Sequence, residues 1–261
     1  MSEACLMDRI LEPGALSVRF QPVYEVHARV ILAHYVECLI RGPLGTSAES
    51  PEILFEYARK KNREAEVDRR CVSVILEAAP TLPAHVRIGI NVHASTLALD
   101  QGFVEFLLAE ARRSSVETDR LVVEIVEHAP PWDVCAFRAA LEALRDLGAA
   151  IALDDVGLGH SNFMMILECR PNYFKIDRYF VQGARTDIYR QAVLSSVAQL
   201  ALPFDAQVVA EGVETEADLE AVRQAGINLV QGYLFGQPGP DVHLAALRAQ
   251  GIADEPGPRI L

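Results

Sequence analysis

The sequence lacks the features that mark exported and membrane-spanning proteins. It has no run of 18 apolar residues and no basic-then-apolar pattern at its start, so we expect no membrane segment and no export signal. Its five cysteines contain no C-x-x-C pair and are widely scattered, at positions 5, 38, 71, 135 and 169. Such spacing is typical of reduced thiols and not of a disulfide framework or a zinc site. We therefore predict a cytoplasmic protein.

Basic residues are also scarce. The chain has 24 Lys and Arg against 36 Asp and Glu, a formal net charge of −12. This balance argues against a long nucleic acid as a partner, because such partners are held on basic surfaces. A small anionic ligand remains compatible with it, since bound metal ions can invert the local potential.

What the chain does have is a pair of adjacent carboxylates at the end of an apolar run. Residues 151–153 are apolar, Asp154 and Asp155 follow, and the next residues form a loop with Gly157 and Gly159. Neighbouring acids repel each other unless a positive charge holds them. At the end of a strand, that charge is commonly a divalent cation.

Short apolar strands alternate with helical segments along the chain. This alternation, with no polar linker, predicts one closed barrel of the eight-fold β/α type, and an open doubly wound sheet is the alternative. We expect a short N-terminal helix and turn over residues 1–16, the barrel over 17–250 and a C-terminal tail over 251–261. Strands are expected at 18–26, 30–40, 86–92, 121–126, 150–153, 173–176, 207–209 and 227–230, and the last helix at 241–249.

The carboxyl ends of the second to eighth strands each present a polar group. One acid after a strand is usually a solvated turn residue or a helix cap, but seven strand ends together make that interpretation improbable. In such barrels these ends form the active site. Carboxylate and amide oxygens suit Mg²⁺ or Mn²⁺, and the surplus of acids suits two ions, about 3.5–4 Å apart, as in enzymes that cleave phosphoesters. The groups are Glu37, Asn91, Glu124, Asp154 with Asp155, Lys175, Glu211 and Gln231.

Lys175 lies between opposing influences in this arrangement. Surrounding anions would raise its pKa and two dications would lower it. It is either a general base for an attacking water or a stabiliser of charge.

Several ordered stretches of the chain resemble the EAL family of cyclic di-GMP phosphodiesterases. The resemblance extends from about Gln21 to Pro238. The matching stretches are Gln21-Pro22-Val23, Glu37-Cys38-Leu39-Ile40-Arg41, Asn91-Val92, Glu124-Ile125-Val126-Glu127, Asp154-Asp155-Val156-Gly157, Phe174-Lys175-Ile176-Asp177, Glu211-Gly212-Val213-Glu214 and the stretch 231–238.

This resemblance implies a fold, an activity and a role for each matched residue. The fold would be a β/α barrel whose first strand is antiparallel to the others. The activity would be hydrolysis of cyclic di-GMP to the linear dinucleotide pGpG, by a homodimer that works with Mg²⁺ or Mn²⁺, is inhibited by Ca²⁺ and responds to an upstream sensor. The implied metal ligands are Glu37, Asn91, Glu124, Asp154, Asp155 and Glu211, with Asp154 as the bridge.

The remaining roles follow from the same resemblance. Lys175 would be the catalytic lysine, working with Glu211 and with Gln231, which positions the water. Glu127 would anchor the loop after the fifth strand. The substrate contacts would be Gln21, Arg41, Asp177 and Glu214, and a guanidinium such as that of Arg41 can fork onto a phosphate.

The chain departs from the family pattern at three places. Cys38 replaces the central Ala of the signature and is expected to pack away from the metals. His93 replaces Ser after the Asn, and we expect it to face solvent or form a hydrogen bond and not to bind metal. The loop 155–162 lacks both aromatic residues of the family's loop, which couples dimerisation to metal binding. The acidic run 64–70 is expected to be a solvated helix face.

Three functions compete on this evidence. The first is the two-metal phosphodiesterase. The second is a receptor that binds cyclic di-GMP without cutting it, which the altered loop would suit, although such receptors usually lose an acid and this chain has kept them all. The third is a barrel glycosidase that uses only Glu124 and Glu211, and it leaves the paired aspartates and Lys175 without a task.

Overall fold

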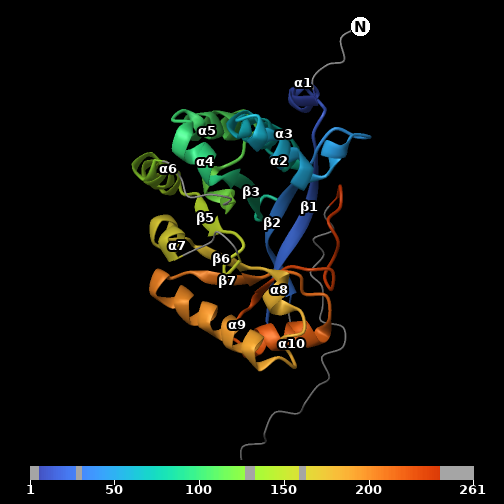
Figure 1. Ribbon diagram of the computed structural model, residues 1–261, viewed down its shortest axis with the longest axis vertical. Helices are drawn as coiled ribbons and strands as arrows, with labels where there is room; N and C mark the ends of the chain where they lie inside the picture. Colours follow the sequence, from blue (N-terminus) through green and yellow to red (C-terminus); the bar gives the residue numbers. More distant parts are fainter. Residues whose placement is uncertain (1–5, 28–30, 127–132, 159–162, 242–261) are drawn as a thin grey trace, which may run out of the picture.

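The computed structural model describes residues 6–27, 31–126, 133–158 and 163–241. Helices and strands alternate along most of this length (Figure 1). In chain order the elements are α1 (Leu6–Leu11), β1 (Ser17–Val26), β2 (Ile31–Arg41), α2 (Pro51–Lys60), α3 (Glu64–Ala78), β3 (Arg87–His93), α4 (Ala94–Leu99), α5 (Phe103–Arg113), β4 (Leu121–Val126), α6 (Val134–Asp146), β5 (Ala150–Leu153), α7 (Phe163–Cys169), β6 (Tyr173–Ile176), α8 (Arg178–Val181), α9 (Ile188–Ala201), β7 (Gln207–Ala210), α10 (Glu216–Gln224) and β8 (Leu229–Val230).

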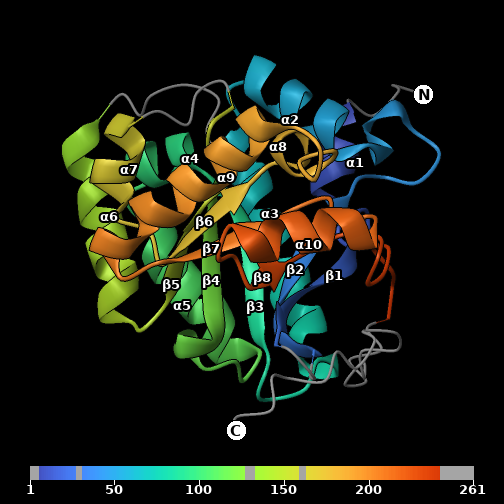
Figure 2. The same ribbon diagram turned by 90° about the horizontal axis from the view of Figure 1, so that it is seen from below.

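The strands close into a barrel in the order β1 to β8, which confirms the predicted fold class (Figure 2). β1 is antiparallel to both of its neighbours, β2 and β8, whereas every later pair is parallel. The antiparallel first strand that the family resemblance implies is therefore present. As a consequence, the carboxyl ends of β2 to β8 all lie at one rim of the barrel.

The hairpin of β1 and β2 extends beyond this rim. The two strands pair from Ser17 opposite Arg41 to Val26 opposite Ile31. In contrast, β3 pairs with β2 only between Tyr35 and Cys38. The outer part of the hairpin, residues 17–19 and 39–41, is thus a two-stranded ribbon above the rim, with α1 beside its far end (Figure 1).

Side chains alternate between the two faces of each strand and form two separate cores. The outward side chains pack against the surrounding helices in one large apolar cluster, which includes Cys38 as predicted. The inward side chains fill the barrel with a smaller apolar layer: Val23, Tyr35, Val122, Ala150, Ala152, Tyr173, Val209 and Leu229. In β2 and β4 to β8, the inward position that follows this layer lies at the rim, and in the antiparallel β1 the position two residues before Val23 does.

The sequence did not predict the short helices α4, α7 and α8. Each has four to seven residues, too few to show a helical period. β8 is shorter than predicted, because only Leu229 and Val230 pair with neighbouring strands. The first strand of the barrel, β1, begins at Ser17. The predicted helix 241–249 and the boundary of the tail lie outside the described residues.

Across the described ranges, every helix is too short or too polar to pass through a bilayer.

Candidate active site

The inward position nearest the rim carries a polar side chain on each of β2 to β8 or directly after its last residue, and these groups meet at the rim. Glu37 is opposite Gln21 and Gly89 in the strand register, and Asn91 is opposite Glu124. Glu37, Glu124, Lys175 and Gln231 are buried. The strand alternation alone therefore places the predicted residues in one layer, directly above the apolar layer that fills the barrel.

Lys175 is at the centre of this layer. Its ammonium Nζ lies 2.5 Å from Glu124 Oε2, 2.8 Å from Glu211 Oε1, 3.2 Å from Asp154 Oδ1 and 3.3 Å from Glu37 Oε2. The lysine side chain is only 1% exposed. Four carboxylates thus share one ammonium group, which leaves the layer with an excess of negative charge.

Two amides fix the orientation of the Glu37 carboxylate. Asn91 Nδ2 donates to Oε1 over 3.0 Å, and Gln231 Nε2 donates to Oε2 over 2.9 Å. β2, β3 and β8 are thereby joined across the barrel mouth. Glu37 is held in position before any ligand binds.

The pKa values of these groups record the crowding of charge. Burial would raise the pKa of Glu37, but Lys175 and the two amide donors outweigh it and leave that pKa lowered. Burial, together with Glu37, raises the pKa of Glu124 well above its usual value. Burial raises the pKa of Glu211 to about 8. The charge of Lys175 opposes this rise and that of Asp154 adds to it. Burial would lower the pKa of Lys175, but the four carboxylates raise it well above normal.

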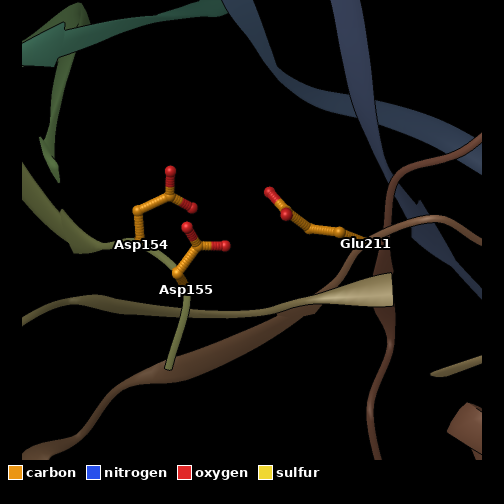
Figure 3. A group of neighbouring side chains, drawn as sticks. All are labelled: Asp154, Asp155 and Glu211. Atoms are coloured by element: carbon orange, nitrogen blue, oxygen red, sulfur yellow. The ribbon is translucent and has the colours of Figure 1, made fainter. Parts of the chain in front are cut away.

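Asp155 reaches the same space as Asp154 because the chain turns sharply there. Consecutive strand residues point to opposite faces, but Asp155 has a φ of 51°, in the left-handed region that Asp tolerates better than most residues. The next residue is tied to β6, since Val156 N donates to Lys175 O over 2.9 Å. Carboxylate oxygens of Asp154, Asp155 and Glu211 consequently lie within 4.8 Å of one another (Figure 3). The pKa of Asp155 is raised to about 6, mainly by burial and further by the nearby charges of Asp154 and Asp177.

Two clefts open beside this layer and share one wall. The smaller, of about 300 Å³, is lined by the predicted substrate contacts Gln21, Arg41, Asp177 and Glu214, and by Lys175 and Gln231. The larger, of about 650 Å³, extends along β2 toward α2, where Phe55 and His93 line it. Arg41 and Asp154 line both clefts. The structure thus brings together all predicted site residues except Glu127, which lies outside the described residues.

The clefts also include a residue that sequence reasoning missed. Arg178, the first residue of α8, lines both of them. It directly follows Asp177, whose side chain accepts a hydrogen bond from Tyr179 N over 2.7 Å and so caps α8. Four helical residues give no periodic signal, but a basic residue three positions after Lys175, directly after the matched motif, could have marked it.

The acidic run 64–70 is not simply a solvated helix face, as the sequence suggested. Asp68, on α3, is fully buried. It accepts hydrogen bonds from His93 N over 3.0 Å, from His93 Nδ1 over 2.9 Å and from Thr96 Oγ1 over 2.6 Å. Asp68 therefore holds the end of β3, which carries Asn91. His93 is a hydrogen-bond partner, in agreement with one of its two predicted roles.

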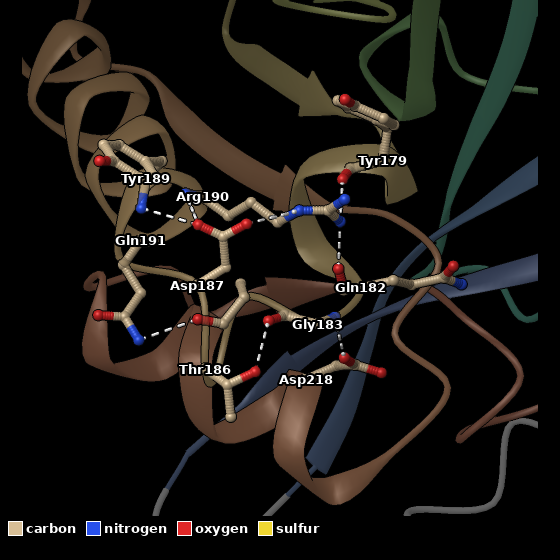
Figure 4. A network of polar contacts seen from close by, with 10 residues as sticks. Tyr179, Gln182, Gly183, Thr186, Asp187, Tyr189, Arg190, Gln191 and Asp218 are labelled. Carbon is tan, nitrogen blue, oxygen red and sulfur yellow. Dashed lines mark hydrogen bonds and ion pairs between the residues drawn. The ribbon is translucent and has the colours of Figure 1, made fainter.

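A second buried acid supports the opposite side of the rim. Asp218, on α10, accepts a hydrogen bond from Thr215 N over 3.1 Å. It accepts another from Gly183 N over 3.2 Å (Figure 4). It joins the loop after β7, which carries Glu214, to the loop after α8. Nearby, Arg190 pairs with Asp187 and donates to the Tyr179 carbonyl oxygen, which fixes α8 against α9.

The donor set fits divalent cations of the hard type. Oxygen ligands from carboxylates and one amide are what Mg²⁺ and Mn²⁺ prefer. Glu124 Oε1 is buried and, among the described residues, accepts no hydrogen bond. Such an atom is costly to bury unless a ligand binds it.

Comparison with known proteins agrees with this geometry. The EAL domain family matches residues 5–238 of the chain. The chain belongs to the EAL family.

Relatives of this chain include proteins named as cyclic di-GMP phosphodiesterases. The chain is 33% identical over 159 residues to the bifunctional diguanylate cyclase/cyclic di-GMP phosphodiesterase MucR of Pseudomonas aeruginosa, covering 61% of this chain and 23% of MucR. It is 29% identical over 172 residues to the cyclic di-GMP phosphodiesterase PdeL of Escherichia coli, covering 66% of this chain and 47% of PdeL. This EAL chain thus spans less than half the length of either relative.

A solved structure with the same fold contains both a metal and the nucleotide. The calcium/cy-diGMP complex of BlrP1 from Klebsiella pneumoniae superposes with a TM-score of 0.76 at 26% identity, covering 87% of this chain and 57% of that protein. Its manganese/cy-diGMP complex gives a TM-score of 0.77 at 27% identity, covering 88% and 58%.

Proposed function

We propose that this protein is a metal-dependent phosphodiesterase that hydrolyses cyclic di-GMP to the linear dinucleotide pGpG. The observation that carries the proposal is the set of four carboxylates within ion-pair distance of Lys175 at the barrel rim. A receptor needs to hold the nucleotide only, whereas these four carboxylates together with Asp155 provide every acid that the proposed two-ion site uses. The relatives named as phosphodiesterases support the choice of substrate.

The proposed cofactors are two Mg²⁺ or Mn²⁺ ions, with Ca²⁺ as an inhibitor. Glu37, Asn91, Glu124, Asp154, Asp155 and Glu211 would hold them, and Asp154 would be shared. When bound, the ions would stabilise charge on the phosphoryl oxygens and lower the pKa of the attacking water.

The remaining residues bind and orient the substrate in this proposal. Arg41 lines both clefts and would contact a phosphate, because a guanidinium forks onto two phosphate oxygens. Gln231 donates one hydrogen bond from Nε2 to Glu37. Its second N–H and its amide oxygen would position the water. Lys175 would take up a proton or stabilise charge at the reaction centre.

Turnover of cyclic di-GMP, followed by chromatography with Mg²⁺, Mn²⁺, Ca²⁺ or EDTA, tests the proposal. Linear product with Mg²⁺ or Mn²⁺, and none with EDTA, is expected. Asp154→Asn should abolish turnover, whereas the control Asp205→Asn, at an exposed loop position away from the clefts, should not. Product formation by Asp154→Asn would contradict the metal assignment, and tight binding without product in any metal would make the protein a receptor.

The proposal extends to a homodimer and to regulation by a sensor domain or partner. α7 presents Phe163 and Leu167 four residues apart, 75% and 64% exposed, and residues so spaced share one face of a helix. A second copy of the chain would cover this face. Sedimentation should show a dimer at micromolar concentration that Leu167→Asp dissociates and Leu99→Asp, on α4, does not.

A further inference from the structure

A third cleft, of about 610 Å³, lies beside the ribbon of β1 and β2 and outside the two clefts described above. Three arginines line it: Arg9 from α1, Arg19 from β1 and Arg41 from the end of β2. The strand register places Ser17 opposite Arg41, and Arg19 is two residues from Ser17 on the same strand. Arg19 and Arg41 therefore emerge on the same face of the ribbon. We call this space the arginine cleft.

The three arginines differ from several others in this chain in their surroundings. Elsewhere the arginines of this acidic chain commonly pair with acids, as Arg59, Arg69 and Arg138 do. Among the described residues, none of the three in the arginine cleft lies within ion-pair distance of an acid. Within the described ranges the Arg41 guanidinium donates one hydrogen bond, from Nη1 to the Ile40 carbonyl oxygen over 3.0 Å. A guanidinium has five N–H donors.

Acids are present in this cleft but do not balance the arginines. Glu12 and Glu49 also line it, so three positive groups face two negative ones in a chain whose net charge is −12. One oxygen of Glu49 is already engaged, since Gly45 N donates to Oε2 over 3.1 Å. The arginine cleft is therefore a local positive site with unused N–H donors.

We propose that the arginine cleft binds a phosphate dianion, either free phosphate or the terminal phosphate of a nucleotide. Planar guanidinium groups recognise phosphate through paired N–H donors. A volume of about 610 Å³ is within the range of small-ligand pockets and exceeds what a phosphate alone requires, so the cleft has room for a nucleoside as well.

The shared arginine couples this site to the catalytic one. Arg41 lines the arginine cleft and both clefts at the barrel rim. A phosphate bound between Arg9 and Arg19 draws the Arg41 guanidinium toward itself and away from the substrate. Occupancy of the arginine cleft thus weakens substrate binding.

Calorimetry in EDTA tests the binding site without any need for activity. The ligands are inorganic phosphate, GMP and, as a control without phosphate, guanosine. Phosphate and GMP should bind the full chain, guanosine should not, and the double variant Arg9→Gln/Arg19→Gln should bind at least tenfold more weakly. Arg112→Gln is the matched control, at an exposed arginine on α5 that pairs with no acid in the described part of the chain, and it should bind as the unaltered chain does.

The outcomes separate the two sources of the ligand. Tighter binding of GMP than of phosphate assigns a nucleotide to the cleft, and equal binding assigns the phosphate group alone. Unchanged affinity in the double variant overturns the proposal.

A second measurement tests the coupling and rests on the proposed function. With Mn²⁺, GMP should raise KM for cyclic di-GMP in the unaltered chain and not in Arg9→Gln/Arg19→Gln, whose basal turnover is unchanged. Equal inhibition of both proteins would overturn the coupling. If neither protein turns over the substrate, the proposed function fails while the calorimetric result still decides the site.

Discussion

At the scale of single residues, the site depends on one buried cation among four buried or half-buried carboxylates. Lys175 is the only cation within ion-pair distance of Glu37, Glu124, Asp154 and Glu211 among the described residues. Removing a partner from such a cluster leaves uncompensated buried charge. Metal ions at the same carboxylates would supply the missing positive charge, so the role of Lys175 can be tested when metal is present.

We predict that Lys175→Ala loses turnover and keeps its affinity for the nucleotide. Loss of a proton-transfer or charge-stabilising group lowers rates by about 10²–10⁴-fold, whereas Arg41 and the cleft walls remain to hold the substrate. The measurement is kcat by chromatography and Kd by calorimetry, both with Mn²⁺, or with Ca²⁺ for binding. If affinity falls together with kcat, Lys175 is a binding residue.

At the scale of secondary-structure elements, two loops at the rim are tied together through a glycine. A Cβ at Gly232, directly after Gln231, would lie 2.1 Å from Val213 O and 2.4 Å from Val213 N. These backbone atoms are fixed, since Val213 N donates to Gln231 O over 3.0 Å and Leu234 N donates to Val213 O over 3.1 Å. Only glycine permits this contact between the loops after β7 and β8.

Gly232→Ala should therefore lower both stability and activity. Forcing the loops apart costs about 1–3 kcal/mol and moves Gln231 away from Glu37. Urea unfolding and turnover assays check the two effects. Gly102→Ala is the control, because its Cβ would meet side-chain atoms and no backbone atom: Arg69 Nη2 at 3.3 Å and Asp100 Oδ1 at 3.8 Å. Equal stability of the two variants would contradict the tight contact.

A bidentate ion pair connects α3 with the loop before α5. Arg69 Nε and Nη2 donate to Asp100 over 2.6 and 2.8 Å. The Arg69 hydrogen bonds, partly opposed by burial, hold the pKa of Asp100 below its usual value. A carboxyl whose pKa is lower in the folded state stabilises the fold above its unfolded pKa, and the effect is lost as the pH falls through the folded pKa.

Asp100→Asn should consequently destabilise the protein at neutral pH by about 1 kcal/mol. The difference from the unaltered chain should shrink as the pH falls below about 4, the ordinary pKa of Asp. Urea unfolding at pH 7 and at lower pH gives both values. Glu56→Gln, which removes an exposed pair with Lys60, should show no measurable change at pH 7. A difference for Asp100→Asn that grows on acidification would contradict the argument.

The sequence predicts the strands and the residues at the rim better than it predicts the buried residues that hold the strand ends in place. Apolar runs mark the barrel strands, and the ends of parallel strands must meet at one rim, so Glu37, Glu124 and Lys175 could be placed together. Asp68 could not, because an acid in an amphipathic helix has the same pattern whether it is solvated or buried. The arginine cleft joins positions 9, 19 and 41 from three elements, and spacing along the chain does not reveal such a meeting.

At the scale of the whole molecule, the polar layer at the rim connects seven strands of the barrel, from Glu37 on β2 to Gln231 after β8. Without metal ions, Lys175 is left to offset the repulsion among all the carboxylates of this layer. Divalent ions bound there would link strands that are far apart in the sequence. Their binding free energy would therefore stabilise the barrel as a unit and not one loop alone.

Mn²⁺ should accordingly raise Tm relative to EDTA. At an ion concentration of about 100 times Kd the fold gains about 2.7 kcal/mol, which corresponds to a Tm shift of roughly 5–10 °C for a chain of this size. Differential scanning calorimetry measures the shift in the unaltered chain, in Glu37→Ala and in the control Asp205→Asn. Glu37→Ala should lose most of the shift, because it removes a ligand that Asn91 and Gln231 hold in place. A full shift in Glu37→Ala would mean that the ions bind outside the polar layer, and the two-ion assignment would fail.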